Sequence, residues 1–198
     1  MRARLWVPVV LCLSLWSVET ALAEGPRRPG TRRILEVTGG TTLSGGTGPA
    51  LGARIGRGAK LKGTPLRAYV IGGVDYGVTR RLDEGGARDE RRDLSLGAGA
   101  RLYIGLPDRL RLHAEVLFGT NRSRSEMWIP NGPKAEAYAW TPQLSLAGGL
   151  AYRVLYELSL GVGVRWMWSR DGLSDLREAR GEEPLRPVSV LAGATWHF

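Results

Sequence analysis

The side chains that could do chemistry in this sequence are charged residues embedded in apolar stretches, where each one alternates with leucine, alanine or valine. In 110–118, for example, Arg111, His113 and Glu115 occupy every second position. Carboxylates, guanidinium groups and imidazole can pair as ions or move protons. The charged set is Glu36, Asp75, Glu115 and Glu157 against Arg54, Arg101, Arg111 and Arg165, with His113 beside them.

A catalytic use of this set needs a nucleophile, a base and an orienting acid within hydrogen-bond reach. His113 and Glu115 share a face, and Ser95 lies on the adjacent predicted strand, but the sequence has no His-x-Ser pair. His197 stands next to the C-terminus, and two scattered histidines are too few for a metal site. We therefore expect no enzyme, no metal and no cofactor.

The elements that position these charges are eight segments with a period of two, the pattern of amphipathic strands. In 156–169 the even positions are Tyr, Leu, Leu, Val, Val, Trp and Trp, while the odd positions include Glu157 and Arg165. The segments are 34–44, 50–57, 66–79, 93–104, 110–121, 137–151, 156–169 and 188–198. Several reach the 9–11 residues that a tilted transmembrane strand needs. The sequence thus predicts an all-β chain, an eight-stranded antiparallel up-and-down transmembrane β-barrel.

The first 23 residues have the layout of a secretory signal peptide: two arginines, the apolar run 5–18, and Ala21 and Ala23 before Glu24. We predict a signal peptide at 1–23, a basic periplasmic leader at 24–33 and the barrel at 34–198. Removal of 1–23 takes away two bases and one acid from 28 and 19, which leaves a net charge of +8. In an exported chain this scattered charge favours lipid phosphates over nucleic acid. The single cysteine, Cys12, lies in the signal peptide.

Two patterns indicate that the apolar face meets lipid rather than a core. The polar face is rich in glycine, which suits a crowded interior. Aromatic residues gather at both strand ends, as in the girdles of membrane barrels. The outer girdle is Tyr76, Phe118, Tyr138, Trp140, Trp166 and Trp168, and the inner girdle is Tyr156, Trp196 and Phe198. The alternative is a soluble, lipocalin-like barrel with its apolar face inside.

The C-terminal segment "VSVLAGATWHF" ends in Phe198 and places Trp196 and Val190 on the same face. It resembles the signal that the barrel-assembly machinery reads in outer-membrane proteins of Gram-negative bacteria. With the signal peptide and eight strands, the mature chain is similar to the small OmpA/OmpX-type barrels. The resemblance implies an outer-membrane location and export through the assembly machinery, without naming an activity. Small barrels that modify lipid A carry lipid-facing catalytic groups, which this sequence does not show.

The inward charges have two interpretations. Equal numbers of each sign predict an interlocking ion network that plugs the lumen, because buried charges are tolerated when paired and eight-stranded interiors are filled. The alternative is a narrow polar pore. We expect replacement of Arg101 or Glu115 by alanine to open or destabilise the lumen.

The outer loops are predicted at 45–49, 80–92, 122–136 and 170–187, and most are longer than the turns at 58–65, 105–109 and 152–155. Their arginines could clamp lipopolysaccharide phosphates, and an exposed apolar tip could contact a surface partner. The loop residues are Arg80, Arg81, Arg91 and Arg92, and Met127, Trp128 and Ile129. We expect a monomer that supports envelope integrity or adhesion, with a small channel as the alternative and a lipid A-modifying enzyme third.

Overall fold

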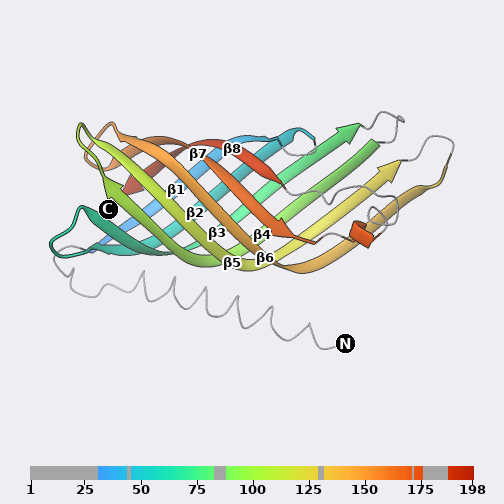
Figure 1. Ribbon diagram of the computed structural model, residues 1–198, viewed down its shortest axis with the longest axis horizontal. Helices are drawn as coiled ribbons and strands as arrows, with labels where there is room; N and C mark the ends of the chain where they lie inside the picture. The colour runs from blue at the N-terminus through green and yellow to red at the C-terminus, as the bar shows by residue number, and fades with distance from the viewer. Residues whose placement is uncertain (1–30, 44–45, 83–87, 129–131, 171, 176–186) are drawn as a thin grey trace.

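Eight antiparallel strands, each hydrogen-bonded to the next, form a closed barrel in the computed structural model (Figure 1). The structure describes residues 31–43, 46–82, 88–128, 132–170, 172–175 and 187–198. The strands are β1 (Thr31–Thr42), β2 (Gly48–Lys60), β3 (Leu66–Leu82), β4 (Arg88–Gly105), β5 (Leu110–Trp128), β6 (Lys134–Arg153), β7 (Leu158–Ser169) and β8 (Val188–His197). The predicted fold class is confirmed. The predicted signal peptide and most of the leader lie outside the described residues.

The barrel closes where β1 pairs with β8, from Ile34 opposite His197 to Thr42 opposite Ser189. Closure leaves no unpaired sheet edge, so the backbone groups of every strand can be satisfied within the sheet, as a bilayer requires. The start of β1 and the C-terminus lie at one end of the cylinder, together with the turns 61–65, 106–109 and 154–157 (Figure 1). We call this the terminal end, and the opposite one the loop end.

The central strands are longer than the sequence pattern indicated. β3 to β6 contain 17, 18, 19 and 20 residues and extend into 80–92 and 122–136, which were predicted as loops. Both faces of these segments are largely polar, so a search for apolar alternation misses them. The segments 80–82, 88–92, 122–128 and 134–136 form what we call the outer extension.

Smaller boundary differences occur at the terminal end. β1 begins at Thr31, inside the predicted leader. β2 begins at Gly48 and continues to Lys60, beyond the predicted segment 50–57 at both ends. β7 begins at Leu158 rather than at residue 156, since 154–157 form the turn.

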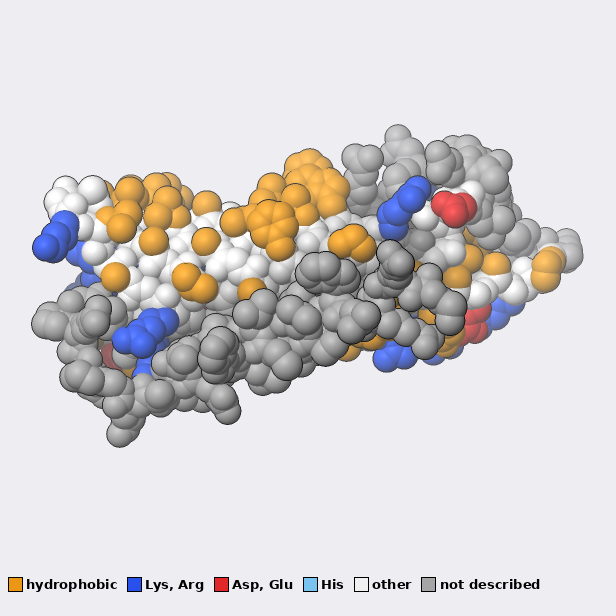
Figure 2. Space-filling view, turned by 90° about the horizontal axis from the view of Figure 1, so that it is seen from below, with side chains coloured by type: hydrophobic (Ala, Val, Ile, Leu, Met, Phe, Trp, Pro, Cys, Tyr) orange, Lys and Arg blue, Asp and Glu red, His pale blue; other side chains and the backbone are white. Residues whose placement is uncertain are grey.

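The apolar face of the barrel points outward. Leu160 and Val162 are 49% and 59% exposed, and further leucines, valines and aromatic residues of the other strands are exposed in the same way. Figure 2 shows these apolar side chains along the barrel wall. An outward belt of this kind is stable in hydrocarbon and not in water. The soluble, lipocalin-like alternative is therefore wrong.

The lumen is filled mainly by polar side chains, with one apolar cluster. Ile34, Tyr69, Ile71, Tyr103 and Leu117 pack together inside the barrel. Three of them are aliphatic residues at inward positions, which the alternation analysis did not anticipate because each is flanked by apolar outward residues. Among the described residues, no helix is long and apolar enough to cross a bilayer.

Candidate functional site

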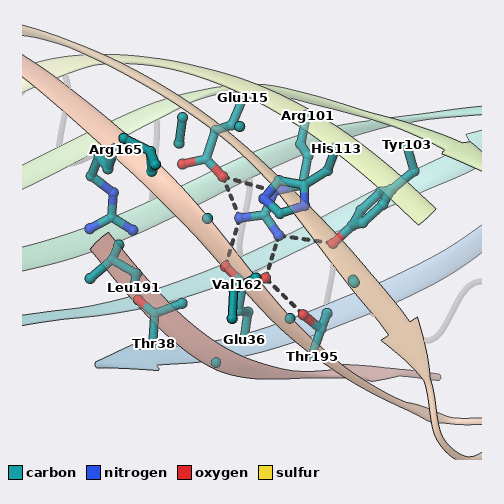
Figure 3. Close-up of a pocket in the computed structure, with 17 residues that line it drawn as sticks. Glu36, Thr38, Arg101, Tyr103, His113, Glu115, Val162, Arg165, Leu191 and Thr195 are labelled. Atoms are coloured by element: carbon teal, nitrogen blue, oxygen red, sulfur yellow. Dashed lines mark hydrogen bonds and ion pairs between the residues drawn. The ribbon is translucent and has the colours of Figure 1, made fainter. Parts of the chain in front are cut away.

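Six charged side chains from six strands form one continuous chain of ion pairs across the lumen. Figure 3 shows four of them: Glu36, Arg101, Glu115 and Arg165. The signs alternate along the chain of ion pairs in the order Arg165, Asp75, Arg54, Glu115, Arg101 and Glu36. We call these six residues the lumen chain. All six are buried, with at most 8% of their surface exposed. Each interior charge of the chain contacts two of the opposite sign, which is how a low-dielectric interior tolerates them.

Arg54 connects the two halves of the lumen chain. Its Nη1 and Nη2 donate to Oδ1 and Oδ2 of Asp75 over 2.9 and 2.8 Å, a bidentate pair. Its Nε donates to Oε1 of Glu115 over 2.9 Å. Asp75 also accepts from Arg165 of β7. Arg54 and Asp75 occupy adjacent strands, whereas Glu115 and Arg165 reach them from across the lumen.

Arg101 makes the second bidentate pair. Its Nη1 and Nη2 donate to the two carboxylate oxygens of Glu36 over 2.6 and 2.7 Å, and its Nε donates to Glu115 over 2.8 Å. The hydroxyl of Thr195 donates to Glu36 over 2.7 Å, and the Tyr103 hydroxyl accepts from Arg101 over 2.9 Å. Every carboxylate in the lumen chain therefore has at least two donors.

A cavity of about 40 Å³ lies beside the lumen chain, lined by Glu36, Arg101, His113, Glu115 and Arg165 among others (Figure 3). This volume holds a few water molecules. Its size matches the filled interior expected for eight strands.

Three residues of the predicted ion network stand apart from the lumen chain. Glu157 is exposed in the turn 154–157, because β7 begins one residue later. Its placement in the network is wrong. Nη1 of Arg111 lies 3.1 Å from Nε2 of His197, and Nδ1 of His113 has no hydrogen-bond partner among the described residues. His113 instead packs beside the ring of Tyr103, with the ring centroids 5.7 Å apart.

A second polar cluster fills the lumen towards the loop end. Nε of Arg91 donates to Asp93 over 2.9 Å, and Asn121 Nδ2 donates to the same carboxylate over 2.6 Å. The hydroxyl of Ser169 accepts from Arg91, and Ser95 donates to Asn121 over 3.0 Å. The sequence analysis missed this cluster, although the period-two spacing of Arg91, Asp93 and Ser95 could have indicated it.

A serine and a histidine meet near the terminal end of the lumen. The Ser159 hydroxyl lies 3.2 Å from Nε2 of His197. Both side chains are buried, and Nδ1 of His197 has no partner among the described residues. The described groups therefore do not complete a nucleophile, base and acid arrangement. They also contain no group of three His, Cys, Asp or Glu residues that could hold a metal ion.

The outward face of the outer extension consists of ion pairs, in which Glu90 and Glu126 are covered by more exposed bases. Glu90 of β4 bonds Arg80 over 3.0 Å and Arg92 over 2.6 Å. The Glu90 side chain is 5% exposed, against 53% for Arg80. Burial alone would raise the pKa of Glu90, but the hydrogen bonds and charges of Arg92 and Arg80 outweigh it and hold the pKa below its ordinary value.

A matching arrangement covers β5 and β6. Glu126 bonds Arg124 over 2.6 Å and Lys134 over 2.9 Å. Glu136 accepts from the Tyr138 hydroxyl over 2.6 Å, and this hydrogen bond, with nearby Arg124 and Lys134, holds the pKa of Glu136 below its ordinary value.

Trp128 lies between two cations at the tip of β5. Arg88 is 5.5 Å and Lys134 is 4.9 Å from its ring centroid. The exposed apolar tip predicted at 127–129 is wrong in part. Met127 points into the lumen and is 1% exposed, because β5 continues to Trp128. Ile129 lies outside the described residues.

The four predicted loop arginines differ in whether their side chains lie inside the barrel or on its outward face. Arg91 is 1% exposed inside the barrel and cannot reach a surface ligand, so its placement in an outer loop is wrong. Arg80 and Arg92 lie on the outward face, and Arg81, at a position of inward parity, is half-buried.

The aromatic residues predicted as girdles all belong to the outward face. Eight of the nine are exposed, and Trp168 is half-buried because it stacks on Trp166, with the ring centroids 4.7 Å apart. Val190, Trp196 and Phe198 of the predicted assembly signal are likewise exposed along β8 and its end. Rings in this position suit the headgroup layers on either side of a bilayer.

No protein-family model and no curated protein matches this sequence. Solved structures of barrels are similar to it. A major outer membrane protein of Thermus thermophilus is 14% identical, with 85% of this chain and 99% of that chain covered and a TM-score of 0.53. Neisserial surface protein A is 16% identical over 85% and 97%, with a TM-score of 0.48. The N-terminal barrel domain of Pseudomonas aeruginosa OprF is 13% identical over 85% and 98%, with a TM-score of 0.46.

At 14% identity, the likeness to the Thermus thermophilus protein shows the fold. The closed ring of eight strands, the outward apolar belt and the polar filled lumen are the features of outer-membrane barrels. The chain has the fold of a small eight-stranded transmembrane β-barrel.

Proposed function

We propose that this protein is a closed structural barrel whose lumen does not conduct and whose outer extension contacts the cell surface. The lumen chain carries the first part of the proposal. An ion that crossed the lumen would have to separate buried, bidentate pairs, and breaking one buried pair costs about 3–5 kcal/mol. The small cavity beside the chain does not bypass it.

Single-channel recording on refolded protein in planar bilayers tests the closed lumen. We expect no unitary conductance from the wild type. Arg101→Ala should conduct or unfold more easily, because it removes the partner of both Glu36 and Glu115. Arg122→Ala, on the outward face, is the control. Steady wild-type conductance would support the channel alternative instead.

The outer extension supports the surface-contact part of the proposal. Two of its outward acids, Glu90 and Glu126, have side chains that are 5% and 8% exposed, against 38–57% for the bases paired with them, and the third, Glu136, is 32% exposed. This face lies next to the outer aromatic residues, at the level of the lipopolysaccharide headgroups. Arginine binds phosphate through paired, charge-assisted hydrogen bonds. The face therefore suits the phosphates of lipopolysaccharide.

Binding of purified lipopolysaccharide to the refolded protein tests this contact. Removing the two cations beside Trp128, in Arg88→Gln/Lys134→Gln, should weaken binding at least about tenfold, because one hydrogen bond to a charged group contributes about 1.5–3 kcal/mol and about 1.4 kcal/mol is a factor of ten. Lys60→Gln/Lys62→Gln at the terminal end is the matched control. Dephosphorylated lipopolysaccharide should bind both variants and the wild type equally. Equal loss in the two double variants would contradict the assignment.

A further inference from the structure

The side-chain charge of this barrel is segregated along its axis. The lumen chain holds three bases and three acids. In the sequence, the segments 80–93, 122–136 and 170–187 hold twelve bases and twelve acids. The described terminal end instead has nine bases and two acids, Asp108 and Glu157. Seven of the eight excess positive charges of the mature chain therefore lie at this end. The nine bases are Arg32, Arg33, Arg57, Lys60, Lys62, Arg67, Arg109, Arg111 and Arg153.

Within the described residues, none of the nine terminal cations has a carboxylate partner, whereas most of the bases of the lumen and the loop end do. The hydrogen bonds that the terminal cations do make go to neutral groups. Arg32 donates to the Tyr156 hydroxyl over 2.6 Å, and Arg153 donates to the Tyr156 carbonyl over 2.8 Å. None of the nine is buried.

Two pairs of these cations stand directly opposite one another on neighbouring strands. Arg33 of β1 faces Arg57 of β2, and Lys60 of β2 faces Arg67 of β3. Like charges in such positions destabilise a sheet. An anion from outside the chain that binds between them would remove this cost.

The nine cations lie around the rim of the terminal end. Arg33 and Arg57 have outward parity, whereas five others have inward parity, at the mouth of the lumen: Arg32, Lys60, Arg67, Arg111 and Arg153. The nine come from five strands and two turns, and Tyr156, Trp196 and Phe198 are exposed at the same end. Figure 2 shows basic side chains at the left-hand, terminal end and both signs at the right-hand end. Arg33 and Arg57 share the outward parity of Leu35 and Ile55. Long basic side chains at this position reach the headgroup layer while their stems lie along apolar surface.

We propose that the terminal end is a binding surface for anionic phospholipids of the leaflet that surrounds it, the periplasmic leaflet in this fold. Arg33 and Arg57, on the outward face, bind the lipid phosphate. The other cations of the rim make the electrostatic potential around this site positive. A zwitterionic headgroup has the same phosphate, but its ammonium group is repelled by this field. The surface therefore selects headgroups with a net negative charge, such as phosphatidylglycerol.

The experiment compares lipid selection by variants from the two ends of the barrel. The mature protein is refolded into bilayers of 70% phosphatidylcholine and 30% phosphatidylglycerol, extracted with mild detergent, and its retained lipids are quantified by mass spectrometry. Enrichment is the ratio of phosphatidylglycerol to phosphatidylcholine among the retained lipids, divided by the same ratio in the bilayer. We expect an enrichment above one in the wild type. Enrichment should fall at least fivefold in Arg33→Gln/Arg57→Gln/Arg67→Gln, because one cation near an anionic leaflet contributes about fivefold in partitioning.

The loop-end triple variant Arg81→Gln/Arg122→Gln/Arg170→Gln removes the same charge and should retain wild-type enrichment. Equal loss in both triples, or no wild-type preference, would overturn the proposal. Binding of soluble polyphosphate without lipid preference would overturn it too and assign the surface to a soluble polyanion. If the triple variant of the terminal end does not fold, the enrichment of the wild type is measured at increasing NaCl concentration instead. Enrichment that persists at 0.5 M NaCl refutes an electrostatic site. The conductance and lipopolysaccharide tests above do not depend on this result.

Discussion

Replacing Glu115 by glutamine should be the most informative change in the lumen, because this carboxylate joins the two halves of the lumen chain. Glu115 accepts from Nε of Arg54 over 2.9 Å and from Nε of Arg101 over 2.8 Å. Glutamine keeps the shape but removes the charge and turns one acceptor into a donor that faces a guanidinium group. Breaking a buried pair costs about 3–5 kcal/mol. We expect a loss of stability in this range.

The assay is equilibrium unfolding in detergent micelles, followed by the fluorescence of the five tryptophans that lie outside the predicted signal peptide and by the shift in mobility of the folded barrel on gels. Glu136→Gln is the matched control. Its carboxylate pairs with Arg124 and Lys134 on the surface, where such pairs contribute at most about 1 kcal/mol.

A double variant separates charge imbalance from loss of packing. Arg54→Met/Glu115→Gln removes one charge of each sign and leaves Arg101 with Glu36 and Arg165 with Asp75. The double variant should therefore be at least about 2 kcal/mol more stable than the sum of the two single changes predicts. Strict additivity, or a Glu115→Gln cost below about 1 kcal/mol, would refute the view that the lumen chain is one electrostatic unit.

Other changes test the wall, the belt and the outer extension. A methyl group on Gly99 would overlap the carbonyl oxygen of Val116 on the neighbouring strand, so Gly99→Ala should cost about 2 kcal/mol or more in unfolding assays. Gly77→Ala, whose new atom has its nearest neighbour 4.0 Å away, should be neutral, and equal effects would contradict the packing. Val162→Arg should cost about 2–4 kcal/mol in lipid vesicles, and a neutral result would mean that this face does not meet hydrocarbon. The pKa of Glu90 is lowered in the folded state, so its stabilisation is present above its ordinary value near 4.5 and is lost as the pH falls below it. The wild type should lose stability between pH 5 and 3 on the order of tenths of a kcal/mol or more relative to Glu90→Gln, and parallel pH profiles would argue against this role.

The fold could be predicted from sequence because lipid on one face and a crowded lumen on the other impose a strict period of two. All six residues of the lumen chain are among the nine that were predicted for the ion network. They could be predicted because alternation with apolar residues is enough to show that each charged side chain points inward. Their partners could not be predicted. Parity fixes the side of the wall, whereas the contact of Arg54 with Glu115 depends on strand tilt and on the stagger around the ring.

The outer extension was missed for a physical reason. Above the belt both faces of β4 and β5 are polar, so Arg92 and Asp93 differ in direction without differing in hydropathy. Residues such as Arg91 and Met127 were therefore assigned to loops. The segregation of charge also required the structure, since the basic residues at the terminal end are spread over more than a hundred positions of the sequence.

The charges of the lumen chain are fully paired only when the barrel is complete. Glu36 on the first strand finds its donors on the fourth and eighth strands, and Asp75 on the third is shared with the seventh. In a partly assembled or truncated sheet, these carboxylates lack their arginine and threonine partners, because the strands that carry the partners are not yet in place. Incomplete intermediates are thus penalised by unmatched charge, and the final seam between first and last strand is favoured only in the correct register.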